Sequence, residues 1–276
     1  MARSTRTMFR KDRDMTTKRN LAVPLIVIGA ILMLPIVVLL VLSFSSGGAG
    51  LTMNNFTVML ERLDFLRYAW NSLKLSVVYT VPVVCSSFLA GYAFARLKAR
   101  GSNVLFGIVV ATMLVPIFVY LIPLFVVYSR LHLTNTVVPW LLWGIGGNAF
   151  YIFLFRQFFD SFPGELEEAA MLDGLNRWKI ITKIVVPNSF TAIATVTILA
   201  FTNVWGEVLV QGVLLFSDSA QTLSVRLAQG VLDTQGISVL IAPTLAAVVL
   251  YVFPPVIVFV VFQRFILQGV ATTGLK

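Results

Sequence analysis

Six long apolar runs dominate this sequence of 276 residues and leave few folds open to it. They cover approximately residues 21–43, 73–95, 103–127, 137–157, 190–213 and 238–262. A helix needs about 20 apolar residues to cross a bilayer core of roughly 30 Å, because each residue adds about 1.5 Å along the helix axis. Membrane-spanning strands are shorter, at about 9–11 residues, and alternate between apolar and polar side chains. The runs therefore predict an all-α membrane protein with six transmembrane helices.

Lysine and arginine gather on one side of the predicted membrane. The amino-terminal segment and every second segment after it hold sixteen of the 21 Lys and Arg residues, the other segments hold four, and Lys74 lies at the start of the second run. Cytoplasmic segments carry the excess of positive charge. We therefore expect both termini and the segment 158–189 in the cytoplasm. Residues 1–19 would form a basic cytoplasmic tail, and residues 20–276 a single transmembrane domain.

The net charge of +9 does not indicate a nucleic-acid partner. A nucleic-acid-binding protein collects its basic side chains on one water-exposed face, whereas here they lie between apolar runs. The expected surroundings are a lipid bilayer and no nucleic acid. Cys85 is the single cysteine and His132 the single histidine, so we expect neither an internal disulfide nor a metal site.

The segment 161–187 is the longest charged stretch after Arg100. Pro163 and the glutamates that follow it favour a helix start, and Gly174 favours a helix end at a positive φ. A second amphipathic helix is predicted over Arg177–Val185, with Trp178, Ile181 and Val185 on one apolar face, and Pro187 would separate it from the fifth span. The cluster of carboxylates disfavours docking on an anionic lipid surface. A cytoplasmic helix-turn-helix that meets another protein is the better interpretation.

The spacing of this segment resembles a known motif. Glu168-Ala169-Ala170, three residues, Gly174, nine residues and then Ile184-x-x-Pro187 is similar to the EAA loop in the membrane subunits of ATP-binding-cassette importers. From about Leu51 to Lys276 the chain resembles the shorter six-span partner of the sugar-transporting, maltose-type branch. The matches outside the loop are Asn71-Ser72-Leu73, Gly91-Tyr92-Ala93-Phe94-Ala95-Arg96, Leu133-x-Asn135-Thr136, Phe162-Pro163-x-Glu165-Leu166 and Gln263-Arg264-Phe265.

The resemblance implies a multi-pass permease domain in the bacterial cytoplasmic (inner) membrane that is not itself an enzyme. Its partners would be a second permease subunit, two copies of an ATPase and an extracytoplasmic solute-binding protein. ATP and Mg would be bound by the ATPases, so no cofactor is expected in this chain. The solute would be a sugar or a sugar derivative.

The resemblance also assigns the coupling residues. In such importers the EAA helix sits in a cleft of the ATPase, and its glutamate can meet an arginine there. Carried over by position, the residues expected to couple ATPase movement to the membrane are Glu168, Ala169, Ala170, Asp173 and Gly174. Within this set, Gly174 would provide the backbone geometry and Glu168 the charged contact.

The fifth apolar run contains one acidic residue, Glu207. Asn203, Glu207 and Gln211 are spaced i, i+4 and i+8, which would place them on one face of a continuous helix. Ionised side chains at membrane depth usually face the bundle interior or water. Two interpretations stay open: this face lines the substrate path and binds substrate hydroxyls, or Glu207 has a structural role.

Two predicted outer loops carry further expectations. The loop 44–69 could include a short surface helix around Val58–Leu66. The loop from Ser217 to Ser238, with Asp218 and Asp233, would face the solute-binding protein that the resemblance implies.

Other function classes fit less well. The sequence contains no Gly-Lys-[Ser/Thr] of a phosphate-binding loop and no common hydrolase motif, which argues against ATP hydrolysis and against a membrane enzyme. A secondary transporter generally uses several ionisable groups within its spans. An importer of the same kind for a non-sugar solute remains the main alternative, and a secondary transporter the next.

Overall fold

The structure, a computed structural model, describes residues 24–45, 50–97 and 99–273. Within these ranges the regular structure is helical, with two isolated β-bridges and no sheet. In this described part of the chain four helices are long and apolar enough to cross a membrane, or up to six if each of two bent helix pairs is one span. The prediction of an all-α chain with membrane-spanning helices is thus confirmed. The basic tail 1–19 lies outside the described residues.

The chain divides into two compact units. The first consists of Met1–Arg62 and Val231–Val249, and the second of Leu63–Gly230 and Leu250–Lys276. We describe each unit by itself.

The first unit contains the helix Pro24–Ser43, the short α2 (Asn54–Arg62) and the beginning of α14 (Ile241–Thr273). The Asn55 amide donates to the backbone oxygens of Ser43 and Ser45, over 2.9 and 2.8 Å. The surface helix predicted around Val58–Leu66 corresponds to α2, which begins and ends four residues earlier. The Thr52 hydroxyl accepts the Asn54 N–H and stabilises this earlier start.

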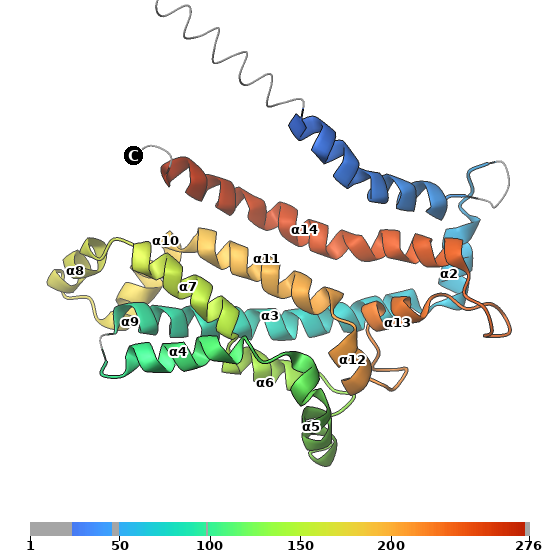
Figure 1. Ribbon diagram of the computed structural model, residues 1–276. Helices are drawn as coiled ribbons and strands as arrows, with labels where there is room; N and C mark the ends of the chain where they lie inside the picture. Colours follow the sequence, from blue (N-terminus) through green and yellow to red (C-terminus); the bar gives the residue numbers. More distant parts are fainter. Residues whose placement is uncertain (1–23, 46–49, 98, 274–276) are drawn as a thin grey trace, which may run out of the picture. The chain divides into compact units, whose positions relative to one another are not determined.

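The second unit is built around α3 (Phe65–Arg96), a helix of 32 residues. It packs against α6 (Val138–Gly146), α7 (Ala149–Ser161) and α11 (Phe190–Gly206), which run alongside it (Figure 1). Gly91 allows the close approach of α7, because a Cβ at this position would lie 2.6 Å from the Cβ of Phe155. Phe88 packs edge to face against Phe155 and Phe159, with ring centroids 5.3 and 5.1 Å apart. This aromatic contact forms the centre of the buried core.

The third apolar run is not one straight span, contrary to the prediction of a helix over 103–127. It forms α4 (Ser102–Thr112) and α5 (Ile117–Arg130), which meet at an angle of 90°. Pro116 explains the break, because proline has no N–H to donate and disfavours helical geometry at the residue before it.

The fourth and fifth runs are interrupted too. Between α6 and α7, Gly147 has a φ of +78°, and the Asn148 side chain caps α7 by accepting the N–H groups of Phe150 and Tyr151. The fifth run forms α11 and α12 (Leu209–Leu214), with Glu207 and Val208 between them. Chain breaks at membrane depth are tolerated where the freed backbone groups are buried in protein or line a water-filled cavity.

The later part of α14 is held against α11. The indole Nε1 of Trp205 donates to the Tyr251 carbonyl over 3.1 Å, and the Tyr251 hydroxyl donates to the Trp205 carbonyl over 2.6 Å. Thr191 donates to the Phe265 carbonyl over 3.0 Å. These bonds fix α11 near both of its ends.

Candidate functional site: the 161–187 loop and a polar cavity

The 161–187 loop folds into two helical segments joined by a turn. The first is α8 (Glu165–Leu172). The second begins as α9 (Arg177–Ile180), continues through a π-helical turn (Ile181–Val185) and ends as α10 (Val186–Asn188). Both segments lie at one end of the second unit, next to the carboxyl end of α3 (Figure 1).

Gly174 ends α8 as the sequence predicted. Its φ is +79°, a left-handed backbone that side chains disfavour. The Gly174 N–H donates to the Met171 carbonyl and the Leu175 N–H donates to the Ala170 carbonyl, each over 3.0 Å. This pair of bonds is a Schellman motif, which satisfies carbonyls at the helix end.

The five predicted coupling residues lie together on this short loop, but they do not share one environment. Ala170 is buried, whereas Glu168, Ala169, Asp173 and Gly174 are exposed. Two large apolar residues, Leu172 and Trp178, are exposed on the same loop.

Trp178 was assigned wrongly. The sequence placed it on the apolar face with Ile181 and Val185, yet its side chain is 63% exposed and Ile180 is buried instead. Ile180 and Val185 are five residues apart, and the π-helical turn between them brings both to the buried side. Leu172, 89% exposed, adds a second large apolar group to the open surface.

Pro187 does not separate this segment from the fifth span. The helix Arg177–Asn188 runs through it, and a bend of 76° follows before α11. Pro187 lies just after the π-helical turn, where the regular α-helical hydrogen-bond pattern is already interrupted.

Glu167 is the residue of this loop that sequence reasoning missed. It is only 5% exposed. One carboxylate oxygen accepts from Arg96 Nε over 2.8 Å, and the other accepts from the Tyr92 hydroxyl over 2.7 Å. Arg96 also donates to the Phe162 carbonyl over 2.6 Å. A buried ion pair therefore ties α8 to the end of α3.

A polar and aromatic cavity of about 600 Å³ lies where the interrupted helices meet. Its walls come from α3, from the start of α5, from the break between α6 and α7, and from the end of α11. Asn203 and Glu207, two of the three residues that the sequence suggested for a substrate path, line this cavity. The side chains that sequence reasoning did not assign to it include Tyr79, Tyr120, Trp143 and Asn148.

The predicted helix face of Asn203, Glu207 and Gln211 is wrong in its geometry. Glu207 has an extended backbone, with φ −74° and ψ 130°, so α11 ends before it. Its carboxylate accepts the N–H groups of Val210 and Gln211, over 2.7 and 2.8 Å, and so caps α12. Glu207 therefore combines a structural role with a position at the cavity wall.

Gln211 does not line this cavity. It is 1% exposed, and its amide donates to the Val204 carbonyl. Its side-chain oxygen accepts from the hydroxyls of Thr222 and Ser224. Gln211 fastens α12 to the start of α13 (Leu223–Gln229).

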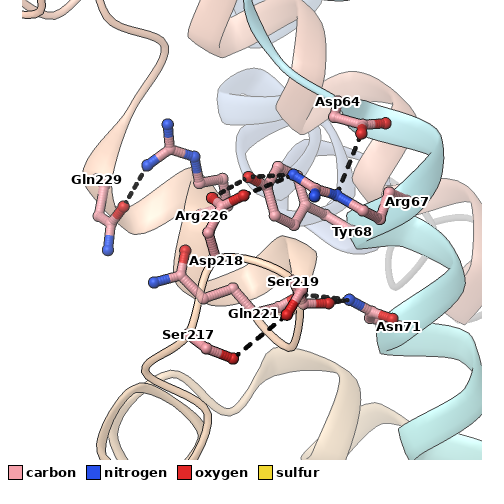
Figure 2. A network of polar contacts seen from close by, with 10 residues as sticks. All are labelled: Asp64, Arg67, Tyr68, Asn71, Ser217, Asp218, Ser219, Gln221, Arg226 and Gln229. Atoms are coloured by element: carbon pink, nitrogen blue, oxygen red, sulfur yellow. Dashed lines mark hydrogen bonds and ion pairs between the residues drawn. The ribbon is translucent and has the colours of Figure 1, made fainter. Parts of the chain in front are cut away.

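A second polar network lies at the other end of α3 (Figure 2). Asp218 accepts from Arg67 over 2.7 Å and from the Tyr68 hydroxyl over 2.6 Å. The Asn71 amide donates to the carbonyls of Ser219 and Gln221, each over 2.9 Å. The loop 217–222 is thereby fastened to the first turns of α3.

This attachment is expected to weaken in acid. Hydrogen bonds from Tyr68 and Arg67 hold the pKa of the Asp218 carboxyl below its usual value. A pKa lowered in the folded state stabilises the fold above the unfolded pKa, about 3.9, and the contribution is lost as pH falls through the lowered value. The thermal midpoint of the wild type should exceed that of Asp218→Asn at pH 7, and the gap should close below about pH 4. A gap that stays constant across this range would contradict the assignment.

Comparisons with known protein sequences match most of this chain. The family described as "Binding-protein-dependent transport system inner membrane component" matches residues 83–272. The chain is 33% identical over 215 residues to the maltose/maltodextrin transport system permease protein MalG of Photorhabdus laumondii, covering 76% of this chain and 72% of that protein. It is 31% identical to the lactose transport system permease protein LacG of Rhizobium radiobacter, covering 78% of each. For the arabinooligosaccharides transport system permease protein AraQ of Halalkalibacterium halodurans, identity is 32%, over 82% of this chain and 80% of that protein.

A solved structure has the same fold. It belongs to a bacterial ABC transporter involved in the import of the acidic polysaccharide alginate, with a TM-score of 0.75 and 24% identity. The similarity covers 96% of this chain and 98% of the solved chain.

Proposed function

Because this chain belongs to the family of binding-protein-dependent transport system inner membrane components, we propose that it is a pore-forming subunit of an ATP-driven sugar importer. The observation that carries this proposal is the family match over 83–272, which includes the 161–187 loop and the cavity residues from Asn148 to Val210. Relatives named for maltose, lactose and arabinooligosaccharide transport support a sugar as the solute.

The subunit performs no chemistry on its solute or on ATP. It receives the sugar from an extracytoplasmic binding protein and forms the pore together with a second permease subunit. Two partner ATPases bind ATP and Mg and drive the movement. The excess of basic residues supports an orientation in which the 161–187 loop and both termini face the cytoplasm of a bacterium and the protein resides in its inner membrane.

The 161–187 loop is the proposed contact with the ATPase. Glu168 and Asp173 offer exposed charge, and Leu172 and Trp178 offer exposed apolar surface beside them. Ala169 leaves room for close approach, while buried Ala170 packs α8 onto its support. Arg96 and Glu167 then connect α8 to α3, so that movement of the loop is passed to the membrane helices.

Asn203 and Glu207 are the proposed substrate-path residues. Gln211, which is buried and hydrogen-bonded through both its side-chain nitrogen and its side-chain oxygen, has no part in that path.

Uptake by cells that carry the complete importer tests the function. Deletion of this chain alone should reduce ATP-dependent uptake of labelled maltose, lactose or arabinotriose to background, and expression from a plasmid should restore it. Loss of amino-acid or phosphate uptake, with sugar uptake intact, would support the non-sugar importer instead. Uptake that survives ATP depletion but collapses with the proton gradient would support a secondary transporter.

A further inference from the structure

We propose that the cavity between α3, α5, α6 and α11 is a subsite for one neutral sugar ring, formed by this subunit's own side chains. The inference rests on the proposed function and goes beyond it, because it assigns a ligand class and further binding residues. The residues proposed to contact the ring are Tyr120, Trp143, Asn148, Asn203 and Glu207, all at the cavity wall.

The backbone around the cavity indicates that water and solute enter it. Three chain interruptions border it: Gly147 and Asn148 between α6 and α7, Glu207 after α11, and Ile117 directly after the bend at Pro116. Irregular backbone at membrane depth is stable only where its polar groups are buried in protein or reach water. Three such breaks at one cavity of about 600 Å³, within the range of small-molecule sites, favour a hydrated path over a packing gap.

The aromatic wall suits the apolar face of a sugar ring. Trp143 is held in place by Trp140 and Tyr128, with ring centroids 5.4 and 5.8 Å away. Tyr120 is 41% exposed, so its ring is free to meet a ligand. Rigid aromatic rings offer a large contact area with little loss of side-chain freedom.

The polar wall suits hydroxyl groups. The Asn203 side chain is exposed and makes no hydrogen bond within the described part of the chain. An amide both donates and accepts, so it pairs with a hydroxyl in either direction. Asn148 and Glu207 add polar atoms whose positions are fixed, because each caps a helix.

The charge of the wall selects against acidic sugars. Glu207 is the one charged residue among those that line this cavity, and no Lys or Arg accompanies it. A uronate would bring a second carboxylate next to Glu207 without a basic partner, and the two like charges would repel each other. A neutral ring avoids this repulsion.

Saturation-transfer NMR on the intact importer in lipid nanodiscs, without binding protein, tests the proposal. The probes are dimannuronate and whichever of maltose, lactose or arabinotriose the wild-type cells take up. Ring protons of the neutral sugar should receive saturation, and dimannuronate protons should not. Tyr120→Leu should reduce the signal at least fivefold, whereas Tyr120→Phe, which keeps the flat ring, should retain it. Asn203→Ala should weaken binding about tenfold, as expected for lost hydrogen bonds.

Phe118→Leu is the matched control, since Phe118 lies exposed on the same helix and does not line the cavity. A transported sugar that gives no signal, an unchanged signal in Tyr120→Leu and Asn203→Ala, or equal saturation of dimannuronate would overturn the subsite. Failure of the wild type to take up any of the sugars would instead contradict the proposed function.

Discussion

Glu167→Leu is expected to reduce sugar uptake more than tenfold while the partner ATPases still hydrolyse ATP. Glu167 holds α8 to α3 through Arg96 and Tyr92. Loss of its carboxylate leaves the Arg96 guanidinium, whose side chain is only 20% exposed, without its ionic partner. Breaking a buried ion pair from one side costs on the order of 3–5 kcal/mol, and access of Arg96 to solvent places this case toward the lower end. A loop that has lost this support would still meet the ATPase but transmit little of its movement.

The ratio of sugar transported to ATP hydrolysed, measured in proteoliposomes, is the readout. Hydrogen exchange of α8 amides provides a second one, because exchange should accelerate in α8 and remain slow in the middle of α3. Glu165→Gln is the control: Glu165 is an exposed carboxylate of the same helix, and it should leave both readouts unchanged.

Exchange of the two charges separates a specific pair from a general loss of packing. Arg96→Glu with Glu167→Arg should recover part of the uptake that either single reversal removes. Equal loss in the single and double variants, with normal exchange in α8, would show that the ion pair does not carry the coupling.

The ion pair between Arg96 and Glu167 makes α3 the helix that connects α8 to the opposite end of the second unit. Arg67 and Arg96 lie near opposite ends of α3 and are separated by roughly 40 Å at 1.5 Å per residue. One end is bonded to the loop 217–222 and the other to α8. Between them, α3 forms part of the cavity wall through Tyr79. A displacement that enters at α8 can thus reach the cavity and the far loop through a single continuous helix.

Sequence reasoning located the spans well because apolar length is a local property. It also found the end of α8, since the need for positive φ at Gly174 follows from chain geometry at one residue. It did not identify Glu167 as a residue that holds α8 in place, because its partner Arg96 lies 71 positions away in the sequence.

Helix continuity was harder to predict than helix position. The spacing of Asn203, Glu207 and Gln211 suits a helix face, but the Glu207 side chain uses its oxygens to start a new helix instead. The spacing of polar residues cannot distinguish a continuous helix from one that ends before Glu207 and restarts as α12, because both have the same sequence. The π-helical turn at Ile181–Val185 had a similar effect: Ile180 and Val185, five positions apart, are both buried, whereas the prediction assumed a spacing of three or four that included Trp178.

Gly174→Leu is expected to uncouple ATP hydrolysis from uptake at normal protein level. A Cβ at this position would meet no atom within 4 Å, so we expect the substitution to act through the backbone. At a φ of +79° a side chain costs about 1–2 kcal/mol, enough to move the α8 end toward another conformation. The turn that directs the chain from α8 into α9 would then be lost for part of the population, and uptake should fall several-fold while ATPase activity persists.

Two companion variants isolate the cause. Gly174→Asn should retain more uptake than Gly174→Leu, because asparagine tolerates left-handed geometry better. Gly164→Leu is the matched control: Gly164 precedes α8, an added Cβ there also meets no atom within 4 Å, and its φ of −69° suits any residue. Equal losses in Gly174→Asn and Gly174→Leu would indicate that side-chain bulk at the ATPase contact, rather than backbone geometry, is responsible. Unchanged uptake by Gly174→Leu would remove Gly174 from the coupling machinery, and the role of the loop would then rest on Glu168 and on the attachment through Glu167.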